Sequence, residues 1–164
     1  MTADTRALVD ALAQELLQRG WMLATAESCT GGLIAAACTE VAGSSRWFER
    51  GFVTYSNEAK TELLGVDPAL LAEHGAVSEK VARAMAFGAL RHAHAQVAVA
   101  VTGVAGPSGG SPDKPVGTVW FGFSVDGRLS SERCLFDGDR AAVRQASVRH
   151  ALQRVLERLR EAAA

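Results

Sequence analysis

The spacing of hydrophobic and polar residues changes along the chain, so that segments with the period of a helix alternate with short apolar segments typical of strands. Leu8, Leu12 and Leu16 recur at every fourth position, which predicts an amphipathic helix over residues 4–19 that Asp4 caps and Gly20 ends. Similar patterns predict helices at 33–41, from a Ser56 or Asn57 cap to 64, at 68–74, from 78 to about 95, and from about 139 to 160. Short apolar runs predict strands at 21–26, 51–55 and 96–101.

Two further apolar runs, 116–125 and 128–136, flank Asp126 and Gly127, a dipeptide typical of the type I′ turn of a β-hairpin. The run at 96–101 is apolar and β-branched, as in strands that are buried on both faces of a parallel sheet. Because helices alternate with strands, we expect one α/β domain over residues 1–164. It has three α/β/α layers around a mixed, mainly parallel sheet that includes one β-hairpin.

The composition supports a globular protein and excludes several classes of partner. Of the 164 residues, 48% are hydrophobic and 21% charged, and the formal net charge of −1 provides no basic field for nucleic acid. An odd set of three cysteines without a CxxC motif suggests neither disulfides nor zinc, so we expect reduced thiols and a cytoplasmic location. The start of the chain lacks a signal-peptide pattern, and no run of 18 apolar residues occurs, so we expect neither export nor a membrane partner.

A strand, a tight turn and a helix follow one another around Ser28. Gly31 and Gly32 allow a tight bend, and the first turn of the following helix offers N–H groups and the positive end of its dipole. A Ser28 hydroxyl at this turn would face an oxyanion hole. The alternative is that Ser28 or Thr30 is only a helix cap, and the spacing is not the G-x-S-x-G of α/β-hydrolases.

A serine nucleophile needs a base, and the four histidines lie in predicted helices far from the glycine-rich turns. His92 and His94 are two residues apart, which does not suit a helical metal pair, so no metal site is predicted. Lys60 is one of three lysines and follows a predicted strand, where partial burial would lower its pKa and free its lone pair. A surface lysine is the alternative.

Glycine and proline dominate residues 102–115, which predicts the one long loop of the chain. Its backbone N–H groups from Gly103 to Gly110 can converge on a phosphate or carboxylate, although neither the P-loop nor the Rossmann motif is present. A flexible surface loop is the alternative. Arg140 and Arg144, at the start of the last helix, can add contacts to an anion. The distal half of that helix, where arginines alternate with Glu157 and Glu161, is predicted to be a solvated face.

Three motifs carry a family resemblance: TAESCTGG at 25–32, GFVTYSNEAK at 51–60 and TGVAGPSGGSPDKPVG at 102–117. Together they resemble the C-terminal domain of the competence/damage-inducible protein CinA, which is similar to the stand-alone nicotinamide-nucleotide amidohydrolases. The resemblance implies hydrolysis of the carboxamide of nicotinamide mononucleotide (NMN) to nicotinate mononucleotide and ammonia. It implies no cofactor, with Ser28 as the nucleophile and Lys60 as the base.

The resemblance also implies roles for other residues of these motifs and of their surroundings. Tyr55 would pack on the pyridine or orient Lys60, with a core position as the alternative. N–H groups near the Ser28 turn would bind the oxyanion, helped by a second serine-containing turn; these positions are Thr30, Gly31, Gly32, Ser44 and Ser45. The loop and the last helix would bind the ribose and phosphate through Thr102, Gly103, Gly106, Arg140 and Arg144.

Two rival interpretations stay open. Cys29 lies beside Ser28 and is a second candidate nucleophile. Alternatively, the chain is a non-catalytic nucleotide-binding or partner-binding module linked to competence or the DNA-damage response. Larger CinA proteins carry an additional N-terminal domain for which this chain has no room, so we expect a free-standing enzyme. A helix-covered sheet of this size often pairs with copies of itself, and the sequence leaves the oligomeric state open.

Overall fold

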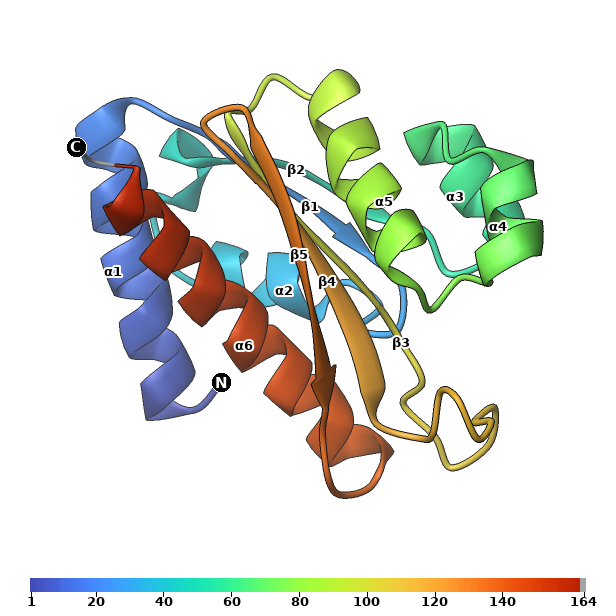
Figure 1. Ribbon diagram of the computed structural model, residues 1–164. Coiled ribbons are helices and arrows are strands. Elements are labelled where there is room, and N and C mark those ends of the chain that lie inside the picture. The colour runs from blue at the N-terminus through green and yellow to red at the C-terminus, as the bar shows by residue number, and fades with distance from the viewer. Residues whose placement is uncertain (163–164) are drawn as a thin grey trace.

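The computed structural model describes residues 1–162 (Figure 1). Its elements follow the order α1 (Ala3–Arg19), β1 (Leu23–Glu27), α2 (Leu33–Thr39), η1 (Ser44–Arg46), β2 (Phe48–Val53), α3 (Asn57–Leu64), α4 (Pro68–His74), α5 (Glu79–Arg91), β3 (Val97–Gly103), β4 (Thr118–Val125), β5 (Arg128–Leu135) and α6 (Arg140–Glu161). The bounds predicted for α4 are confirmed, and Ser56, Ser78 and Asp139 cap α3, α5 and α6.

The five strands form one sheet in the order β2-β1-β3-β4-β5. β1 pairs in parallel with β2 and β3, whereas β4 is antiparallel to both β3 and β5. Four strands therefore run in one direction and β4 in the other. The predicted hairpin is β4 and β5, and Asp126 (φ 52°) and Gly127 (φ 75°) have the positive φ of a type I′ turn. The predicted mixed, mainly parallel α/β sheet is confirmed.

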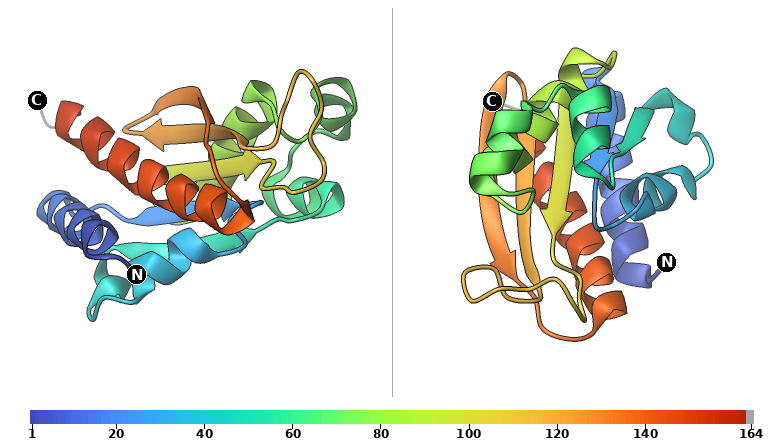
Figure 2. Two further views of the ribbon diagram at one scale, coloured as in Figure 1. Left: turned by 90° about the horizontal axis from the view of Figure 1, so that it is seen from below. Right: turned by 90° about the vertical axis from the view of Figure 1, so that its right-hand side faces the viewer.

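Helices cover both faces of the sheet, which gives the predicted three layers (Figure 2). α1, α2 and α6 pack on one face, where Leu16, Phe121 and Leu152 belong to the larger apolar core. α5 covers the other face with α3 and α4 beside it, and Met85 and Leu64 belong to the core there. None of the helices within residues 1–162 is both long and apolar enough to cross a membrane.

Several predicted boundaries are wrong for identifiable reasons. The cap of α1 is Thr2, whose hydroxyl accepts from the Thr5 N–H, while Asp4 lies in the first turn, where its charge suits the helix dipole. β2 begins at Phe48 rather than at residue 51. The prediction missed its first residues because the polar Glu49 and Arg50, which an edge strand tolerates, interrupt the apolar run. α5 ends at Arg91 rather than near residue 95.

A close approach of two backbones fixes where α3 lies. A Cβ atom on Gly88 of α5 would lie 1.9 Å from the carbonyl oxygen of Leu64, the last residue of α3. Only glycine allows this distance, so Gly88 lets α3 lie directly against α5. α3 carries Lys60, and this contact therefore sets the position of that lysine relative to the sheet.

Candidate active site

Ser28 lies at the carboxyl end of β1, directly after the last residue of that strand. Its N–H donates to the carbonyl of Val101 on the neighbouring β3 at 2.9 Å, so the serine backbone continues the sheet. Its side chain is largely buried and lines a cavity at this edge of the sheet. Ligands of open α/β sheets bind at such carboxyl ends, so an active site is expected at this edge of the sheet.

Lys60 reaches the same point from α3, where the Ser56 cap begins the helix after β2. Lys60 is 1% exposed, and its Nζ lies 2.9 Å from the Ser28 Oγ. Nζ also lies 2.9 Å from the Thr54 carbonyl oxygen and 3.4 Å from that of Tyr55. The structure therefore brings the two side chains together across 32 positions of sequence.

Burial lowers the pKa of Lys60 from its ordinary 10.5, which favours the neutral amine. A neutral amine has two N–H donors and one lone pair. The carbonyls of Thr54 and Tyr55 can accept the two donors, which leaves the lone pair directed at the Ser28 hydroxyl. This arrangement suits a base that removes the proton of the serine.

Cys29 lines the same cavity, but its environment opposes a nucleophilic role. Burial, with a smaller contribution from the negative charge of Glu27, raises the pKa of the Cys29 thiol to about 11. Because the thiolate is the reactive form, this cysteine is a poor nucleophile near neutral pH.

Not all of the backbone N–H groups in the turn after Ser28 are available to bind an oxyanion. The Gly31 N–H donates to the Ser28 carbonyl at 2.9 Å, so the predicted oxyanion contact from Gly31 is wrong. Within the described chain, the N–H groups of Cys29, Thr30 and Gly32 have no intramolecular acceptor, and of these three residues only Cys29 lines the cavity.

Ser44 and Ser45 are not brought to this site. They lie in η1, which precedes β2, whereas Ser28 follows the parallel neighbour β1. The two serines are therefore at the opposite end of the sheet, about 15 Å or more away along a six-residue strand. The prediction that they help to bind an oxyanion is wrong for this chain, because the sequence does not reveal that β2 runs parallel to β1, which places the turn before β2 far from the residue after β1.

The cavity around Ser28 and Lys60 has a volume of about 290 Å³. Thr102, Gly103 and Gly106 line it as predicted, and Thr102 also donates from Oγ1 to the Ala76 carbonyl at 3.0 Å. Ala76 and Val77 form a wall that the sequence did not indicate, because these residues carry no chemical group and arrive only through the packing of α5. Lys114 braces that wall by donating to the His74 carbonyl at 2.6 Å.

Tyr55 lies at the mouth of the cavity with 57% of its surface exposed, so the core alternative is wrong. Its hydroxyl accepts from Arg140 Nη2 at 2.8 Å, and Arg140 Nη1 donates to the Gly106 carbonyl at 2.9 Å. Arg140 therefore joins the segment after β2 to the glycine-rich loop. Only the backbone carbonyl of Tyr55 contacts Lys60.

Arg144 does not line this cavity. Its guanidinium donates to the carbonyls of Cys29 at 3.2 Å and Thr30 at 3.3 Å. Arg144 therefore stabilises the Ser28 turn from outside the cavity. Together with Arg140 it borders an adjoining cavity of about 660 Å³.

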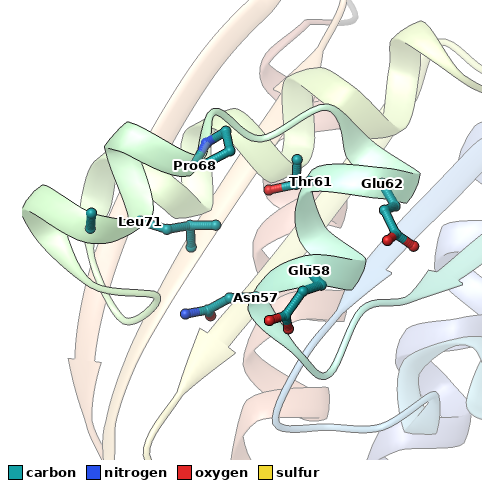
Figure 3. Close-up of a pocket in the computed structure, with 7 residues that line it drawn as sticks. Asn57, Glu58, Thr61, Glu62, Pro68 and Leu71 are labelled. Carbon is teal, nitrogen blue, oxygen red and sulfur yellow. The ribbon is translucent and has the colours of Figure 1, made fainter.

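A separate cavity of about 380 Å³ lies on the outer side of α3 and α4 (Figure 3). Glu58 and Glu62 of α3 border it, opposite Pro68 and Leu71 of α4. Neither Ser28 nor Lys60 lines this cavity, and Asn57 is the one lining residue that it shares with the cavity around Ser28. Its lining holds no paired nucleophile and base.

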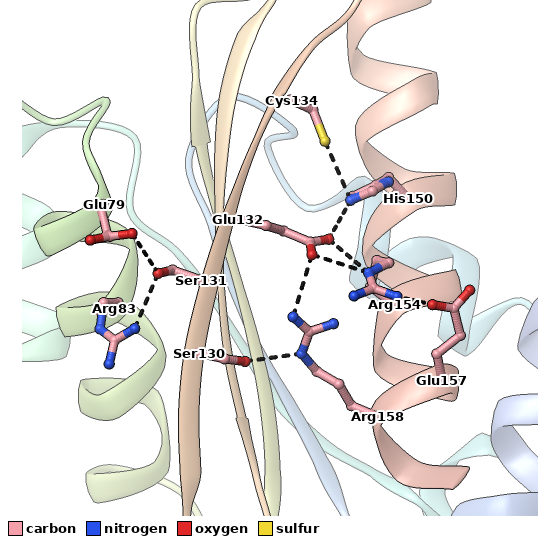
Figure 4. Close-up of polar contacts among 10 residues, drawn as sticks. All are labelled: Glu79, Arg83, Ser130, Ser131, Glu132, Cys134, His150, Arg154, Glu157 and Arg158. Atoms are coloured by element: carbon pink, nitrogen blue, oxygen red, sulfur yellow. Dashed lines mark hydrogen bonds and ion pairs between the residues drawn. The ribbon is translucent and has the colours of Figure 1, made fainter. Parts of the chain in front are cut away.

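Several side chains in the distal half of α6 contact the sheet (Figure 4). Glu132 of β5 accepts from Arg154 at 2.9 Å, is 2.6 Å from His150 and accepts from Arg158 at 3.4 Å. Burial alone would raise the pKa of Glu132, but hydrogen bonds from Arg154 and His150 lower it. Arg158 also lies over the Phe123 ring at 4.1 Å. Arg154 and Arg158 thus join α6 to the sheet, and His150 is a satisfied structural residue. Arg160, at the end of the helix, has a side chain that is 58% exposed, as the solvated-face prediction expects.

Comparison with known proteins gives the family. The sequence matches the CinA C-terminal domain over residues 5–159. The chain belongs to the CinA C-terminal domain family. Nicotinamide-nucleotide amidohydrolase PncC of Enterobacter agglomerans is 58% identical over 142 residues, which are 86% of this chain and 87% of that protein. The protein of the same name from Escherichia coli K12 is 55% identical over 147 residues, 89% of each chain.

Solved structures of the family share the fold. The competence/damage inducible protein CihA from Agrobacterium tumefaciens superimposes with a TM-score of 0.93 at 45% identity, covering 96% of each chain. The CinA superfamily protein KP700603 from Klebsiella pneumoniae gives a TM-score of 0.92 at 43% identity, covering 96% of this chain and 98% of that one. The α/β sheet described above is thus the fold of the CinA C-terminal domain family.

Proposed function

We propose that this protein is a nicotinamide-nucleotide amidohydrolase that converts NMN to nicotinate mononucleotide and ammonia. One observation carries the chemistry: the buried Lys60 amine lies 2.9 Å from the Ser28 hydroxyl inside a cavity of suitable size for a small ligand. The names and the high identity of the two PncC relatives support the substrate.

The first half of the reaction forms an acyl-enzyme. The Ser28 oxygen attacks the carboxamide carbon while the neutral Lys60 amine takes the hydroxyl proton. The carbonyl oxygen becomes an oxyanion, and the Cys29 N–H is the donor we assign to it. The Lys60 ammonium then returns its proton to the amide nitrogen, the C–N bond breaks, and ammonia leaves.

The second half releases the product by the same groups in the reverse order. Neutral Lys60 takes a proton from a water molecule, which attacks the ester carbon of the acylated Ser28. The ester bond breaks, the proton returns to the Ser28 oxygen, and nicotinate mononucleotide leaves. No step needs a cofactor, because both reacting groups are side chains of this chain.

The remaining lining residues would orient the nucleotide. The Tyr55 ring lies at the mouth, where it can cover the pyridine, and Arg140 beside it offers a fixed guanidinium to the phosphate. Thr102 and the loop glycines Gly103 and Gly106 border the space left for the ribose. We assign Arg144 to bracing the turn. The three cysteines are free thiols, which suits the cytoplasm as the proposed location.

A coupled ammonia assay on the purified protein tests this proposal with NMN, nicotinamide riboside and nicotinamide as substrates. We expect the highest kcat/KM for NMN, since only NMN offers Arg140 a phosphate, and no turnover by Ser28→Ala. Binding of NMN by calorimetry without ammonia release from any substrate would contradict an enzyme and favour the binding-module alternative.

A further inference from the structure

Glu27 is a buried carboxylate that the reaction above does not use. It is the last residue of β1, 0% exposed, and directly precedes Ser28. Its Oε1 accepts from the Thr30 hydroxyl at 2.7 Å and from the Ile34 N–H at 2.8 Å, and its Oε2 accepts from the Ala35 N–H at 3.0 Å. All three partners are donors, which is the environment that a buried carboxylate requires.

These three contacts tie the middle of the nucleophile turn, residues 28–32, and the start of α2 to the end of β1. Thr30 lies inside the turn, while Ile34 and Ala35 lie in the first turn of α2. Gly31 (φ 58°) and Gly32 (φ 103°) occupy left-handed conformations between them, where the backbone has the most freedom in the unfolded chain. The Glu27 carboxylate therefore fixes a segment whose own sequence favours several conformations.

The same contacts decide which N–H groups remain for a substrate. Ile34 and Ala35 donate to Glu27, and Gly31 donates to the Ser28 carbonyl. The N–H groups of Cys29, Thr30 and Gly32 are left without an intramolecular acceptor within residues 1–162, and of these residues only Cys29 lines the cavity. Cys29 follows the nucleophile directly, which is where serine hydrolases commonly place an oxyanion donor.

We propose that Glu27 is a positioning residue, which holds the 28–32 turn so that the Ser28 hydroxyl meets Lys60 while the Cys29 N–H group faces the developing oxyanion. This inference rests on the proposed amidohydrolase function for its kinetic consequence. Glu27 acts through the turn and does not touch the substrate, since it is fully buried and does not line the cavity.

Glu27→Gln is the first test, because the side-chain amide keeps one oxygen for Thr30 and Ile34 but turns an NH2 group toward the Ala35 N–H. We expect kcat for ammonia release from NMN to fall roughly 10- to 100-fold, the usual cost of a displacement of about 1 Å in an active site. KM should stay near its wild-type value. A folded Glu27→Gln protein with wild-type kcat would overturn the proposal.

Two further variants separate positioning from stability. Glu132→Gln is the control, because Glu132 is also a hydrogen-bonded carboxylate but lies on β5, three strands away from β1. It should lower the midpoint of thermal unfolding while kcat stays unchanged. Thr30→Val removes only the 2.7 Å bond inside the turn and keeps the residue shape. It should lower kcat less than Glu27→Gln does, and it remains informative where Glu27→Gln fails to fold. Unchanged kcat in Thr30→Val would also contradict the inference.

Alkylation of Cys29 gives a readout that does not depend on turnover. The negative charge of Glu27 contributes to the raised pKa of Cys29, and the turn covers its thiol. Iodoacetamide labelling followed by peptide mass spectrometry should therefore be faster for Cys29 in Glu27→Gln than in the wild type, with Cys134 as the internal reference. An unchanged Cys29 rate would contradict the role of Glu27. Wild-type protein that releases no ammonia from NMN would instead refute the proposed function and leave this labelling result interpretable.

Discussion

The Lys60 amine and the Ser28 hydroxyl owe their proposed chemistry to where they lie, because neither is reactive in water near neutral pH. Burial lowers the pKa of Lys60, and the neutral amine can donate to two backbone carbonyls and direct its lone pair at Ser28. The neighbouring thiol experiences the opposite effect, since burial keeps Cys29 protonated. Desolvation thus favours a base at Lys60 and an unreactive thiol at Cys29, although both residues line the same cavity.

The pH dependence of activity follows from the need for neutral Lys60. We expect kcat/KM for NMN to rise with pH up to a plateau, with a midpoint below the ordinary lysine value of 10.5. A kcat/KM that does not change with pH anywhere in the range in which the protein stays folded would contradict a titrating base in this role.

The same burial links folding to pH. Between the lowered pKa of folded Lys60 and 10.5, the unfolded chain binds more protons at this residue than the folded chain. The contribution of Lys60 to the free energy of unfolding therefore rises with pH across this window and is constant outside it. Urea denaturation of the wild type and Lys60→Met at several pH values measures this. Inside the window, the free energy of unfolding should rise more steeply with pH for the wild type than for Lys60→Met. Below the window, the two proteins should show the same dependence on pH.

Replacement of the neighbouring thiol tests the rival nucleophile. Cys29→Ala should release ammonia from NMN with a kcat within about threefold of the wild type, since a thiol with a pKa of about 11 supplies little thiolate. Loss of turnover in a folded Cys29→Ala protein, with normal Ser28→Ala activity, would assign the reaction to the cysteine.

At the scale of elements, the site depends on how α3 lies against α5. Lys60 reaches Ser28 from α3, and α3 approaches α5 so closely that Gly88 has no room for a side chain. The Ser56 cap and the Gly65 end fix the length of α3, and Leu64 packs into the core beneath α5. The position of the base is thus a property of helix packing.

Gly88→Ala should disturb this packing. Its Cβ would meet the Leu64 carbonyl oxygen at 1.9 Å, so α3 must shift, at a cost of about 1–3 kcal/mol or more in the free energy of unfolding. We also expect kcat to fall, because the shift moves Lys60. Phe87→Ala, on the exposed side of the same helix, is the matched control and should leave kcat unchanged. Chemical denaturation and the ammonia assay together check both expectations.

At the scale of the whole molecule, the sheet gathers the site at the carboxyl ends of its parallel strands. Ser28 follows β1, Tyr55 follows β2, and the loop after β3 closes the third side. The alternation of patterns along the chain predicted this architecture, and the motifs predicted that Ser28 and Lys60 share a pocket. The sequence could not show that β2 runs parallel to β1, which places Ser44 and Ser45 at the opposite end of the sheet from Ser28, nor that Glu27 binds the first turn of α2, because these relations exist only after packing.

The proposed mechanism also makes a prediction for the whole enzyme. Each proton transfer is assigned to Lys60, so ammonia release from NMN should be unchanged after dialysis against a chelator. Activity that is lost on chelation and restored by a divalent ion would contradict the assignment of the chemistry to side chains alone.

The most direct test of the account is ammonia release from NMN by the wild type, Ser28→Ala and Lys60→Arg, each checked for folding by circular dichroism. Arginine keeps the positive charge and much of the length of lysine but does not deprotonate in proteins. We predict no detectable turnover for Ser28→Ala and a loss of roughly 10²- to 10⁴-fold in kcat for Lys60→Arg, the usual contribution of a general base. A Lys60→Arg protein that keeps most of the wild-type kcat would contradict the claim that a neutral Lys60 activates Ser28.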